Sequence, residues 1–369
     1  MKVTIRQTKR LANLLVAVVL VAGMCVLNGC GKQESSQKTQ EQKPEVVVIG
    51  GVYPLTGPMA AFGQSAKIGL EDGVRYANVN ILAGTKYRLD AKVEDSKGDP
   101  QTGVLAFRRI VDGFKARICN AILSNVAVAL KPLADAEGIL LFADSTHSSL
   151  RDGTTLRHSQ TADQEAAFLL TYCHNTLQAS NIVALVSDDD YGASFSKALG
   201  DNVQVLRYDP KAPDLKPIAL KSAAIDSDAI VLVGVGGSLG ELIRTIREGG
   251  YKGAMLATVA FDVVPSTRQV AGDAAKGLSY PRLVQDPDAL NSAVTSGQVT
   301  NTLAGMSAIK VIAFNDAVFV AKALAAGKSQ PKDIRDFLLN EKQIDGVGTS
   351  VTPRPDGTLL PRLEMTKVR

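Results

Sequence analysis

The stretch at residues 46–79 constrains the fold of this chain more than any other. An apolar run at 46–52 is followed by a loop rich in Gly and Pro at 53–63, and then by apolar residues at helical spacing at 64–79. Strand, loop and helix in that order form the opening unit of an open α/β sheet. Small molecules bind such sheets beyond the carboxyl ends of the strands, where loops meet helix N-termini. The loop therefore indicates a ligand site, although an ordinary connection between strand and helix gives the same spacing.

Strand and helix patterns alternate along most of the remaining chain. Residues 87–93 alternate apolar and charged side chains, which is typical of a half-buried edge strand. Apolar runs that fit buried strands follow at 118–123 and 138–143, and a second series starts at 181–187. Because the series of strand–helix units restarts, we predict an α/β fold with two doubly wound parallel sheets. Residues 302–326 differ and predict one long helix.

The first 29 residues have the pattern of a secretory signal peptide. Four basic residues without any acid precede an apolar run at residues 11–27, and small residues lead to Cys30. An uncleaved membrane anchor is the alternative, and the apolar run is near the lower length limit for a membrane span. Residues 30–45 carry no large apolar side chain after the cysteine, so we predict a flexible tether there.

Charge and cysteine content exclude several functions. Without the four basic residues of the signal segment, the 41 Lys and Arg fall to the same number as the 37 Asp and Glu. This balance gives no support to nucleic-acid binding. The three His residues form no zinc pattern with Cys, so we expect no metal and no cofactor. Cys119 and Cys173 are predicted as buried free thiols, with a disulfide as the alternative.

A glycine-rich turn at residues 234–240 has nearly the layout of a dinucleotide fingerprint. A predicted strand precedes it, a helix at 241–248 follows it, and Asp262 ends the next predicted strand. In that motif the glycines let a pyrophosphate approach the helix N-terminus and the acid binds the ribose. The glycine spacing here is one residue too long, and an exported chain does not meet cytosolic nicotinamide cofactors. We therefore expect a plain turn that faces a cleft.

Several motifs, taken together and in order, carry a resemblance over nearly the whole chain after the signal segment. They are Pro-Leu-Thr-Gly-Pro in the loop at 53–63, Asp95 to Pro100, Ser124-Asn125, the segment 156–164, Asp190-Tyr191-Gly192, residues 271–277 and Phe314-Asn315-Asp316-Ala317. The set resembles the periplasmic substrate-binding proteins of ABC transporters, of the type that binds the branched-chain amino acids Leu, Ile and Val. The ending Leu27-Asn28-Gly29-Cys30 looks like a lipobox, which implies that Cys30 carries lipid.

The resemblance implies a type I periplasmic-binding fold, in which two lobes are joined by three hinge segments. We place the hinges near residues 157–162, 279–284 and 345–350. The N-terminal lobe would then comprise residues 46–157 and 284–345, and the C-terminal lobe residues 162–279 and 350–369. The implied partners are one small molecule, an ABC permease complex and the membrane through the lipid anchor. The implied location is the periplasm or cell envelope.

The same resemblance assigns candidate binding residues in the cleft. Ser124 and Thr146 would bind a carboxylate, with simple helix capping as the alternative. Phe62 would lie over the ligand, or else pack in the core. Tyr191 would close over the ligand from the second lobe. The full set is Phe62, Ser124, Asn125, Ser145, Thr146, His147, Tyr191 and Asp262.

One departure concerns the acid that pairs with a ligand ammonium in amino-acid-binding members. The matching position falls nearest Ala260, and a small insertion or deletion would bring Asp262 to it. We therefore expect delivery of an amino acid or of a related small carboxylate or amide to an ABC importer. The alternatives are a sensor or partner-binding lipoprotein of the same fold, and a secreted enzyme. No nucleophile motif of the Gly-x-Ser-x-Gly type supports an enzyme.

Overall fold

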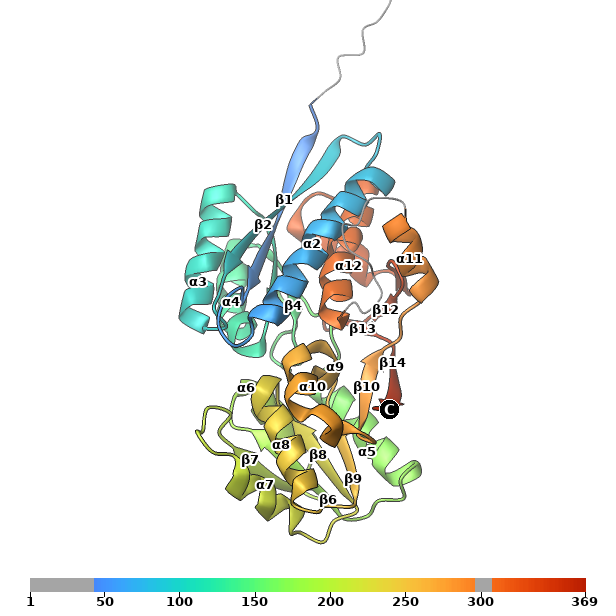
Figure 1. Cartoon of the computed structure of the whole chain (residues 1–369). Coiled ribbons are helices and arrows are strands. Elements are labelled where there is room, and N and C mark those ends of the chain that lie inside the picture. The colour runs from blue at the N-terminus through green and yellow to red at the C-terminus, as the bar shows by residue number, and fades with distance from the viewer. Residues whose placement is uncertain (1–42, 296–306) are drawn as a thin grey trace, which may run out of the picture. The chain divides into compact units, whose positions relative to one another are not determined.

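A computed structural model describes residues 43–295 and 307–369, and Figure 1 shows its elements. The predicted signal peptide at 1–29, the lipidation site Cys30 and the tether up to residue 42 lie outside the described residues. Within the described ranges, no helix is long and apolar enough to cross a membrane. Two parallel sheets, each flanked by helices, account for most of the described chain. This confirms the expected α/β class.

The first sheet has the strand order β2-β1-β3-β4-β5, and all its neighbours are parallel. Its strands form because short apolar runs can be buried on both faces under helices. β2 is the edge strand that the alternating pattern predicts. The strands are β1 (Glu45–Tyr53), β2 (Tyr87–Asp95), β3 (Ile118–Ile122), β4 (Leu140–Asp144) and β5 (Thr155–Leu156).

The helices of this lobe include two that are far apart in sequence but lie side by side in Figure 1, α2 and α12. Their close approach depends on two glycines of α2. A Cβ on Gly69 would lie 2.2 Å from the backbone oxygen of Lys310, and one on Gly73 would lie 2.4 Å from that of Phe314. The helices are α2 (Ala60–Asn80), α3 (Pro100–Arg108), which continues as a π-helical turn (Arg109–Gly113), α4 (Ser124–Glu137), α12 (Ala308–Ala325) and α13 (Pro331–Leu339).

The second sheet has the order β14-β10-β9-β8-β6-β7, with every pair parallel except β14 with β10. Its strands are β6 (Ile182–Ser187), β7 (Gln204–Tyr208), β8 (Ala229–Val233), β9 (Ala254–Ala257), β10 (Ser279–Leu283) and β14 (Leu363–Lys367). The helices around it are α5 (Ala162–Asn175), α6 (Asp190–Ala198), α7 (Lys216–Ala223), α8 (Gly236–Glu248), α9 (Ala260–Val263) and α10 (Pro265–Ala271), followed by a 3-10 turn (Gly272–Ala275).

The chain returns to the first sheet after β10, through α11 (Pro287–Thr295), and leaves it again near the C-terminus. The expected third crossing at residues 345–350 is wrong in position. β11 (Ile344–Asp345), β12 (Ser350–Pro353) and β13 (Leu359–Pro361) form a small antiparallel sheet whose apolar side chains join the first core. The chain crosses only between β13 and β14, because β14 completes the edge of the second sheet.

The two thiols of the described chain lie in separate cores. Cys119 is buried with the apolar side chains beneath α3 and α4, and Cys173 is buried against the second sheet. Both are free. The predicted pair of buried thiols is therefore confirmed, and the disulfide alternative is wrong.

Candidate ligand-binding cleft

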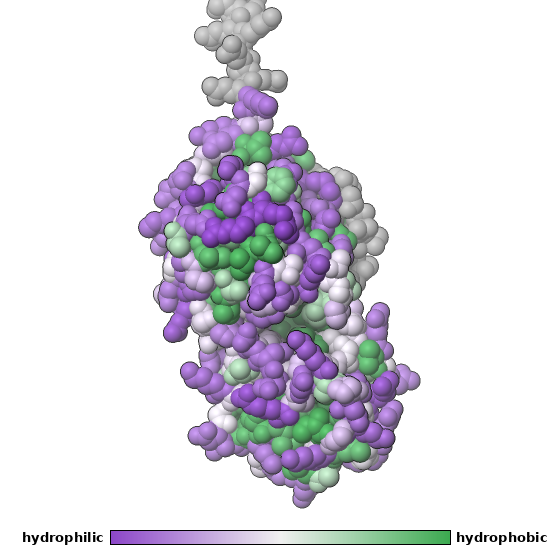
Figure 2. Space-filling view, turned by 90° about the vertical axis from the view of Figure 1, so that its left-hand side faces the viewer, coloured by the Kyte–Doolittle hydropathy of each residue, from purple (hydrophilic) through white to green (hydrophobic). Residues whose placement is uncertain are grey.

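A cavity of about 730 Å³ lies at the carboxyl ends of the strands of both sheets. Loops and helix starts that follow β1, β3 and β4 line it from the first sheet, and those that follow β6, β8 and β9 line it from the second. The space-filling view shows a hollow with hydrophobic residues in it midway along one face (Figure 2). The carboxyl ends of strands from both sheets therefore meet at one site, which is where open α/β sheets bind small molecules.

The loop at residues 53–63 is held in one shape at the cavity edge. Asp95 accepts hydrogen bonds from the backbone N of Leu55 at 2.8 Å and from Oγ1 of Thr56 at 2.6 Å. Burial alone would raise the pKa of Asp95, but these bonds and one from the backbone of Lys97 lower it. Gly57 has φ +84°, a conformation that side-chain-bearing residues rarely adopt. The sequence motif thus encodes a rigid turn, which places the start of α2 at the cavity.

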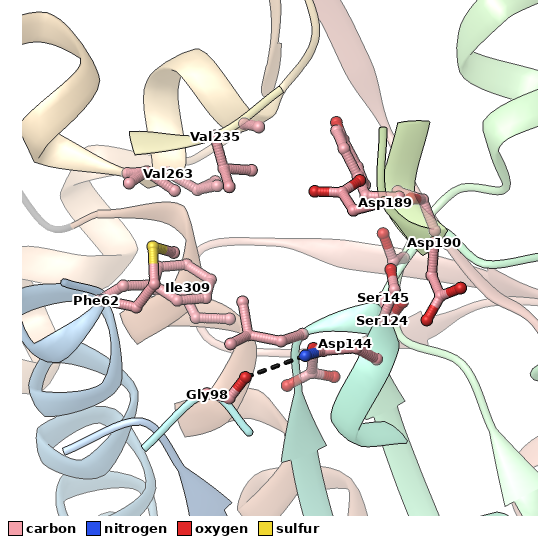
Figure 3. A pocket seen from close by; sticks show the side chains of 18 of the residues that line it. Phe62, Gly98, Ser124, Asp144, Ser145, Asp189, Asp190, Val235, Val263 and Ile309 are labelled. Atoms are coloured by element: carbon pink, nitrogen blue, oxygen red, sulfur yellow. Dashed lines mark hydrogen bonds between the residues drawn. The ribbon is translucent and has the colours of Figure 1, made fainter. Parts of the chain in front are cut away.

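Two serine hydroxyls meet on the first-lobe side of the cavity. The Oγ atoms of Ser124, at the start of α4, and Ser145, directly after β4, are 2.7 Å apart. Ser124 does not cap α4, because the cap residue is Leu123 and no side chain bonds there. Asn125 donates from Nδ2 to the backbone oxygen of Gly98 at 2.9 Å, the dashed line in Figure 3. Thr146 also lines the cavity, and its buried Oγ1 has no partner in the described chain.

Apolar side chains form much of the remaining wall. Phe62 is 6% exposed and belongs both to the first core and to the cavity lining, so packing and ligand contact are compatible roles. Figure 3 shows Phe62 and Ile309 on one side of the cavity and Val235 and Val263 opposite them. Val235 is the second residue of the glycine-rich turn at 234–240, which therefore faces the cleft as expected. A ligand of this cavity has room for an apolar part.

The second lobe contributes Tyr191 from the first turn of α6. Its hydroxyl donates to Oγ1 of Thr258 at 2.8 Å, and its ring packs on that of Phe195 with centroids 5.1 Å apart. Burial raises the pKa of Tyr191 well above its usual value, so the hydroxyl keeps its proton. Asp189 caps α6 by accepting from the backbone N of Gly192 at 2.9 Å. The sequence Asp-Asp-Tyr-Gly thus fixes the position of the Tyr191 ring.

Two predicted site residues do not line the cavity. Nδ1 of His147 lies 2.8 Å from Oγ of Ser149 in the loop after β4. Asp262 lies in the short helix α9 and not at a strand end, and it pairs with Arg268 at 3.4 Å. Burial raises the pKa of Asp262, and Arg268 opposes that rise. Ala260 lines the cavity instead, because the turn of α9 directs Asp262 away from it. Asp262 is therefore absent from the cavity lining, and its expected role toward a ligand ammonium gains no support from the geometry.

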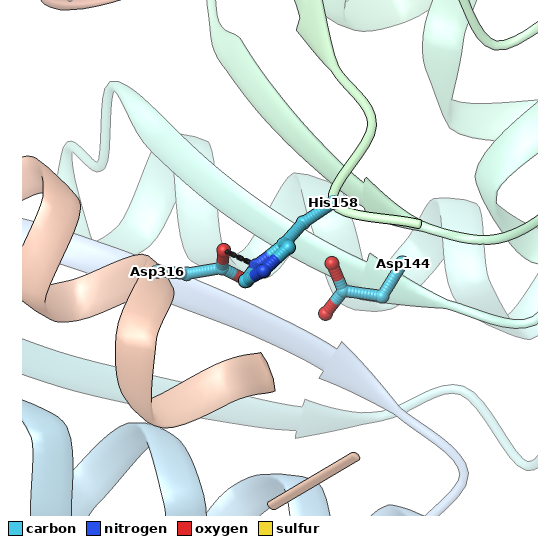
Figure 4. A group of neighbouring side chains, drawn as sticks. All are labelled: Asp144, His158 and Asp316. Atoms are coloured by element: carbon cyan, nitrogen blue, oxygen red, sulfur yellow. Dashed lines mark hydrogen bonds and ion pairs between the residues drawn. The ribbon is translucent and has the colours of Figure 1, made fainter. Parts of the chain in front are cut away.

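Sequence reasoning missed a buried polar cluster at the floor of the cavity. Asp144 and His158 line the cavity, and Asp316 of α12 lies behind them (Figure 4). His158 Nδ1 is 2.7 Å from Asp316 Oδ1, and Asn120 donates from Nδ2 to both carboxylates. The available signal was the position of Asp144 at the last residue of β4, directly before Ser145 and Thr146.

Burial dominates the protonation of this cluster. It raises the pKa of Asp144 well above the usual value, and the nearby Asp316 raises it further. It raises the pKa of Asp316 as well, against bonds from neighbouring groups. Burial lowers the pKa of His158 to about 4, so its ring is neutral at neutral pH. The cluster therefore has no cation of its own, and burial favours the protonated form of its two acids.

A ligand cavity between two parallel α/β lobes, lined by strand ends from both, defines the class of type I periplasmic binding proteins. The chain belongs to the periplasmic binding protein family, whose model matches residues 46–369. It is similar to the Leu/Ile/Val-binding protein homolog 3 of Brucella melitensis, with 25% identity over 226 residues, 57% of this chain and 60% of the relative. It is also similar to the Leu/Ile/Val-binding protein BraC3 of Rhizobium johnstonii, with 25% identity over 62% of this chain and 61% of the relative. The chain thus spans about 60% of the length of these curated relatives.

Solved structures support the fold. The substrate-binding protein LivJ of Streptococcus pneumoniae, in complex with isoleucine, matches with a TM-score of 0.76 and 18% identity, covering 88% of this chain and 97% of that one. A solute-binding protein of an ABC transporter from R. palustris, in complex with 4-hydroxybenzoate, matches with a TM-score of 0.74 and 18% identity, covering 88% and 93%. Together with the family match, these confirm the type I fold.

Proposed function

We propose that this protein is a lipid-anchored extracytoplasmic receptor that delivers one small solute to an ABC importer. The solute class is an amino acid or a related small carboxylate or amide. The observation that carries the proposal is the cavity of about 730 Å³ lined from both lobes, because a solute that touches both lobes favours the arrangement in which they enclose it. The curated relatives are named as Leu/Ile/Val-binding proteins, and these names favour the same function.

The polar groups of the cavity suit a small solute with hydrogen-bonding ends. Ser124, Ser145 and Thr146 offer hydroxyls at the first-lobe strand ends, next to backbone N–H groups at the start of α4. Tyr191 offers a ring and a protonated hydroxyl from the second lobe. The apolar wall around Phe62 accommodates an aliphatic or aromatic part. Such a division, few polar anchors and a mostly apolar wall, is typical of small-molecule sites.

The bound solute can be identified directly. The full chain is purified from its native envelope in mild detergent and denatured, and the released small molecule is identified by mass spectrometry. We expect one solute at one copy per chain, which raises the melting temperature when it is returned. Thr146→Val should weaken its binding, whereas Thr171→Val, an exposed control, should not. If the released solute binds equally well to both variants and to wild type, the cavity is not its site.

Transport and anchoring need separate tests. Cells that lack the gene should lose high-affinity uptake of the labelled solute, and retained uptake would favour the sensor or partner-binding alternative. The lipid anchor predicts that the mature N-terminal peptide begins at Cys30 with a diacylglyceryl thioether, which mass spectrometry detects. Cys30→Ala should move the protein from the membrane fraction to the soluble fraction. An unmodified Cys30 in membrane-bound protein would contradict the anchor.

A further inference from the structure

Asp144 is a buried acid, and only one of its two carboxylate oxygens has a hydrogen-bond partner in the described chain. The residue is 8% exposed and lines the cavity floor. Its Oδ2 accepts a hydrogen bond from Nδ2 of Asn120 at 2.9 Å, whereas its Oδ1 has no partner in the described parts of the chain. Figure 3 places Asp144 beside Ser124 and Ser145 at this end of the cavity. A buried polar atom without a partner is costly, so a group that completes it is expected.

The groups packed around Asp144 supply no positive charge. They are Asp316 on α12, His158 in the segment after β5, Asn120 on β3 and Tyr53 on β1. His158 is neutral and already pairs with Asp316, and the buried hydroxyl of Tyr53 has no hydrogen-bond partner in the described chain. Over the described residues, no Lys or Arg bonds to Asp144. A cation that pairs with this carboxylate would therefore come from outside the described chain.

We propose that the solute of the cleft carries a positively charged nitrogen, and that the Asp144 carboxylate of the first lobe binds it. This rests on the proposed function and names its substrate class. The assignment differs from the expectation from sequence, which placed the acid for an ammonium at Asp262 in the second lobe. Thr146, whose unpartnered Oγ1 lies two residues from Asp144, would accept a second hydrogen bond from the same nitrogen.

The charge of the cavity rim agrees with this assignment. Six acids line the cavity and two lysines oppose them, Lys97 and Lys211. One of the acids, Asp188, is paired with Arg207 at 3.1 Å. The others are Asp99, Asp144, Asp189, Asp190 and Asp209. Salt screens the exposed acids of the rim, which serve to attract a cationic solute. The buried Asp144 selects which solute binds.

The class of solute follows from the two surfaces it must meet. Asp144 and Thr146 take an ammonium, amidinium or guanidinium, and the wall of Phe62, Ile309 and Val263 takes a small apolar body. A carboxylate elsewhere on the solute is compatible with the hydroxyls of Ser124 and Ser145. A solute with a carboxylate and no cationic nitrogen would bring a second negative charge to the ionised form of Asp144 and is disfavoured there.

A divalent cation is the competing occupant. One ligand atom each from Asp144, His158 and Asp316 lies within 4.8 Å of the others. However, the amide nitrogen of Asn120 already bonds to an oxygen of each carboxylate, and His158 bonds to Asp316. Donors therefore occupy the space between the carboxylates, and the open oxygen of Asp144 is the remaining position. This geometry favours an organic cation on the cavity side over a metal inside the cluster.

The test compares probes that share one body and differ in charge. Phenethylamine, 3-phenylpropionate and 3-phenylpropanamide, together with 3-methylbutylamine, 4-methylpentanoate, 4-methylpentanamide and leucine, are titrated into the full chain by calorimetry. We expect each amine to bind at least about tenfold more tightly than the carboxylate of the same body. Asp144→Asn should remove that preference. Asp201→Asn, at an exposed position outside the cavity lining, should keep it.

A pH series on wild type keeps the proposal testable if Asp144→Asn does not fold. The pKa of Asp144 is raised, so a cation that binds its ionised form should bind more tightly as pH rises through that pKa. Carboxylates that bind its protonated form would show the opposite slope. Amine affinity that rises with pH supports the proposal, and a carboxylate preference or a falling amine slope overturns it.

Three further outcomes overturn the proposal without by themselves overturning the proposed function. Amides or carboxylates that bind in the cavity without any amine preference would sustain a receptor of another specificity. A rise in melting temperature with Mg²⁺, Mn²⁺ or Zn²⁺ that Asp144→Asn abolishes would assign the open oxygen to a metal. If no probe binds at all, the inference falls, and the solute released from native protein decides the proposed function independently.

Discussion

Nδ1 of His158 lies 2.7 Å from Oδ1 of Asp316, and this contact joins the segment after β5 to the centre of α12. Both side chains are about 1% exposed. The segment that carries His158 leads directly to α5 and the second sheet. The contact therefore fixes the first crossing of the chain to the lobe that holds Asp144, and it sets the floor of the cleft.

Removing Asp316 should destabilise the protein measurably. Asp316→Ala leaves the buried His158 ring without its acceptor and removes one of the two acceptors of the Asn120 amide, so we expect a loss of about 2–4 kcal/mol in the free energy of unfolding. Urea denaturation followed by circular dichroism measures the loss. The exposed control Asp201→Ala should change the free energy by less than about 0.5 kcal/mol. Equal effects of the two substitutions would contradict a role for the buried pair.

The side chain of Arg157 should hold the turn before β13 against the segment after β5, where the chain first crosses to the second sheet. Its side chain is buried and donates to the backbone oxygen of Leu150 at 2.9 Å, to Thr358 and to Asp356. Arg157→Met removes these donors but keeps much of the volume, so we expect faster amide hydrogen exchange at residues 356–359. Arg151→Met, at an exposed position, is the matched control. Unchanged exchange at 356–359 in Arg157→Met would show that the backbone pairing alone fixes the turn.

Glu165 should make stability fall as pH rises. Burial raises its pKa to about 7, against hydrogen bonds from Gln160 and the backbone of Val259. A folded-state pKa above the unfolded value near 4.5 stabilises fully below about pH 4.5, and this contribution is lost as pH rises through about 7. The loss amounts to about 3 kcal/mol. Other acids also titrate, so the measurement is the difference between wild type and Glu165→Gln in urea titrations at each pH. A difference that stays constant with pH would refute the assignment.

The two described thiols should resist alkylation in the folded protein. Burial raises the pKa of Cys119 to about 12 and that of Cys173 to about 11, so neither forms the reactive thiolate at neutral pH. Iodoacetamide labelling, mapped by peptide mass spectrometry, should label both only after denaturation. Rapid labelling of either thiol in native protein would mean that its core opens readily.

The parts of the fold that follow from the sequence are those with strong local patterns. Each buried strand is a short apolar run, and the prolines and glycines at residues 53–63 predict a loop there. The third crossing was misplaced because β11, β12 and β13 pair antiparallel with one another, and their short strands carry no local signal of which lobe they join. Only the packing of Val351 and Leu359 in the first core decides that.

The residues of the cleft also divide into those that sequence motifs predicted and those that only tertiary packing brings together. Ser124, Ser145, Thr146 and Tyr191 were predicted from the family resemblance of the motifs that carry them, and all four line the cavity. Asp262 was misplaced because a single turn of helix, α9, follows β9 and rotates that side chain away. The cluster of Asp144, His158 and Asp316 was missed because its members come from three distant segments. Their proximity depends on tertiary packing that no local pattern records.

The central claim is that one solute is held between the strand ends of both lobes. Hydrogen–deuterium exchange with mass spectrometry, with and without the solute released from native protein, tests it most directly. We predict that the solute slows exchange together at residues 123–126 and 144–147 of the first lobe and at 189–192 and 258–261 of the second. Protection confined to one lobe, or found away from these four segments, would contradict the claim.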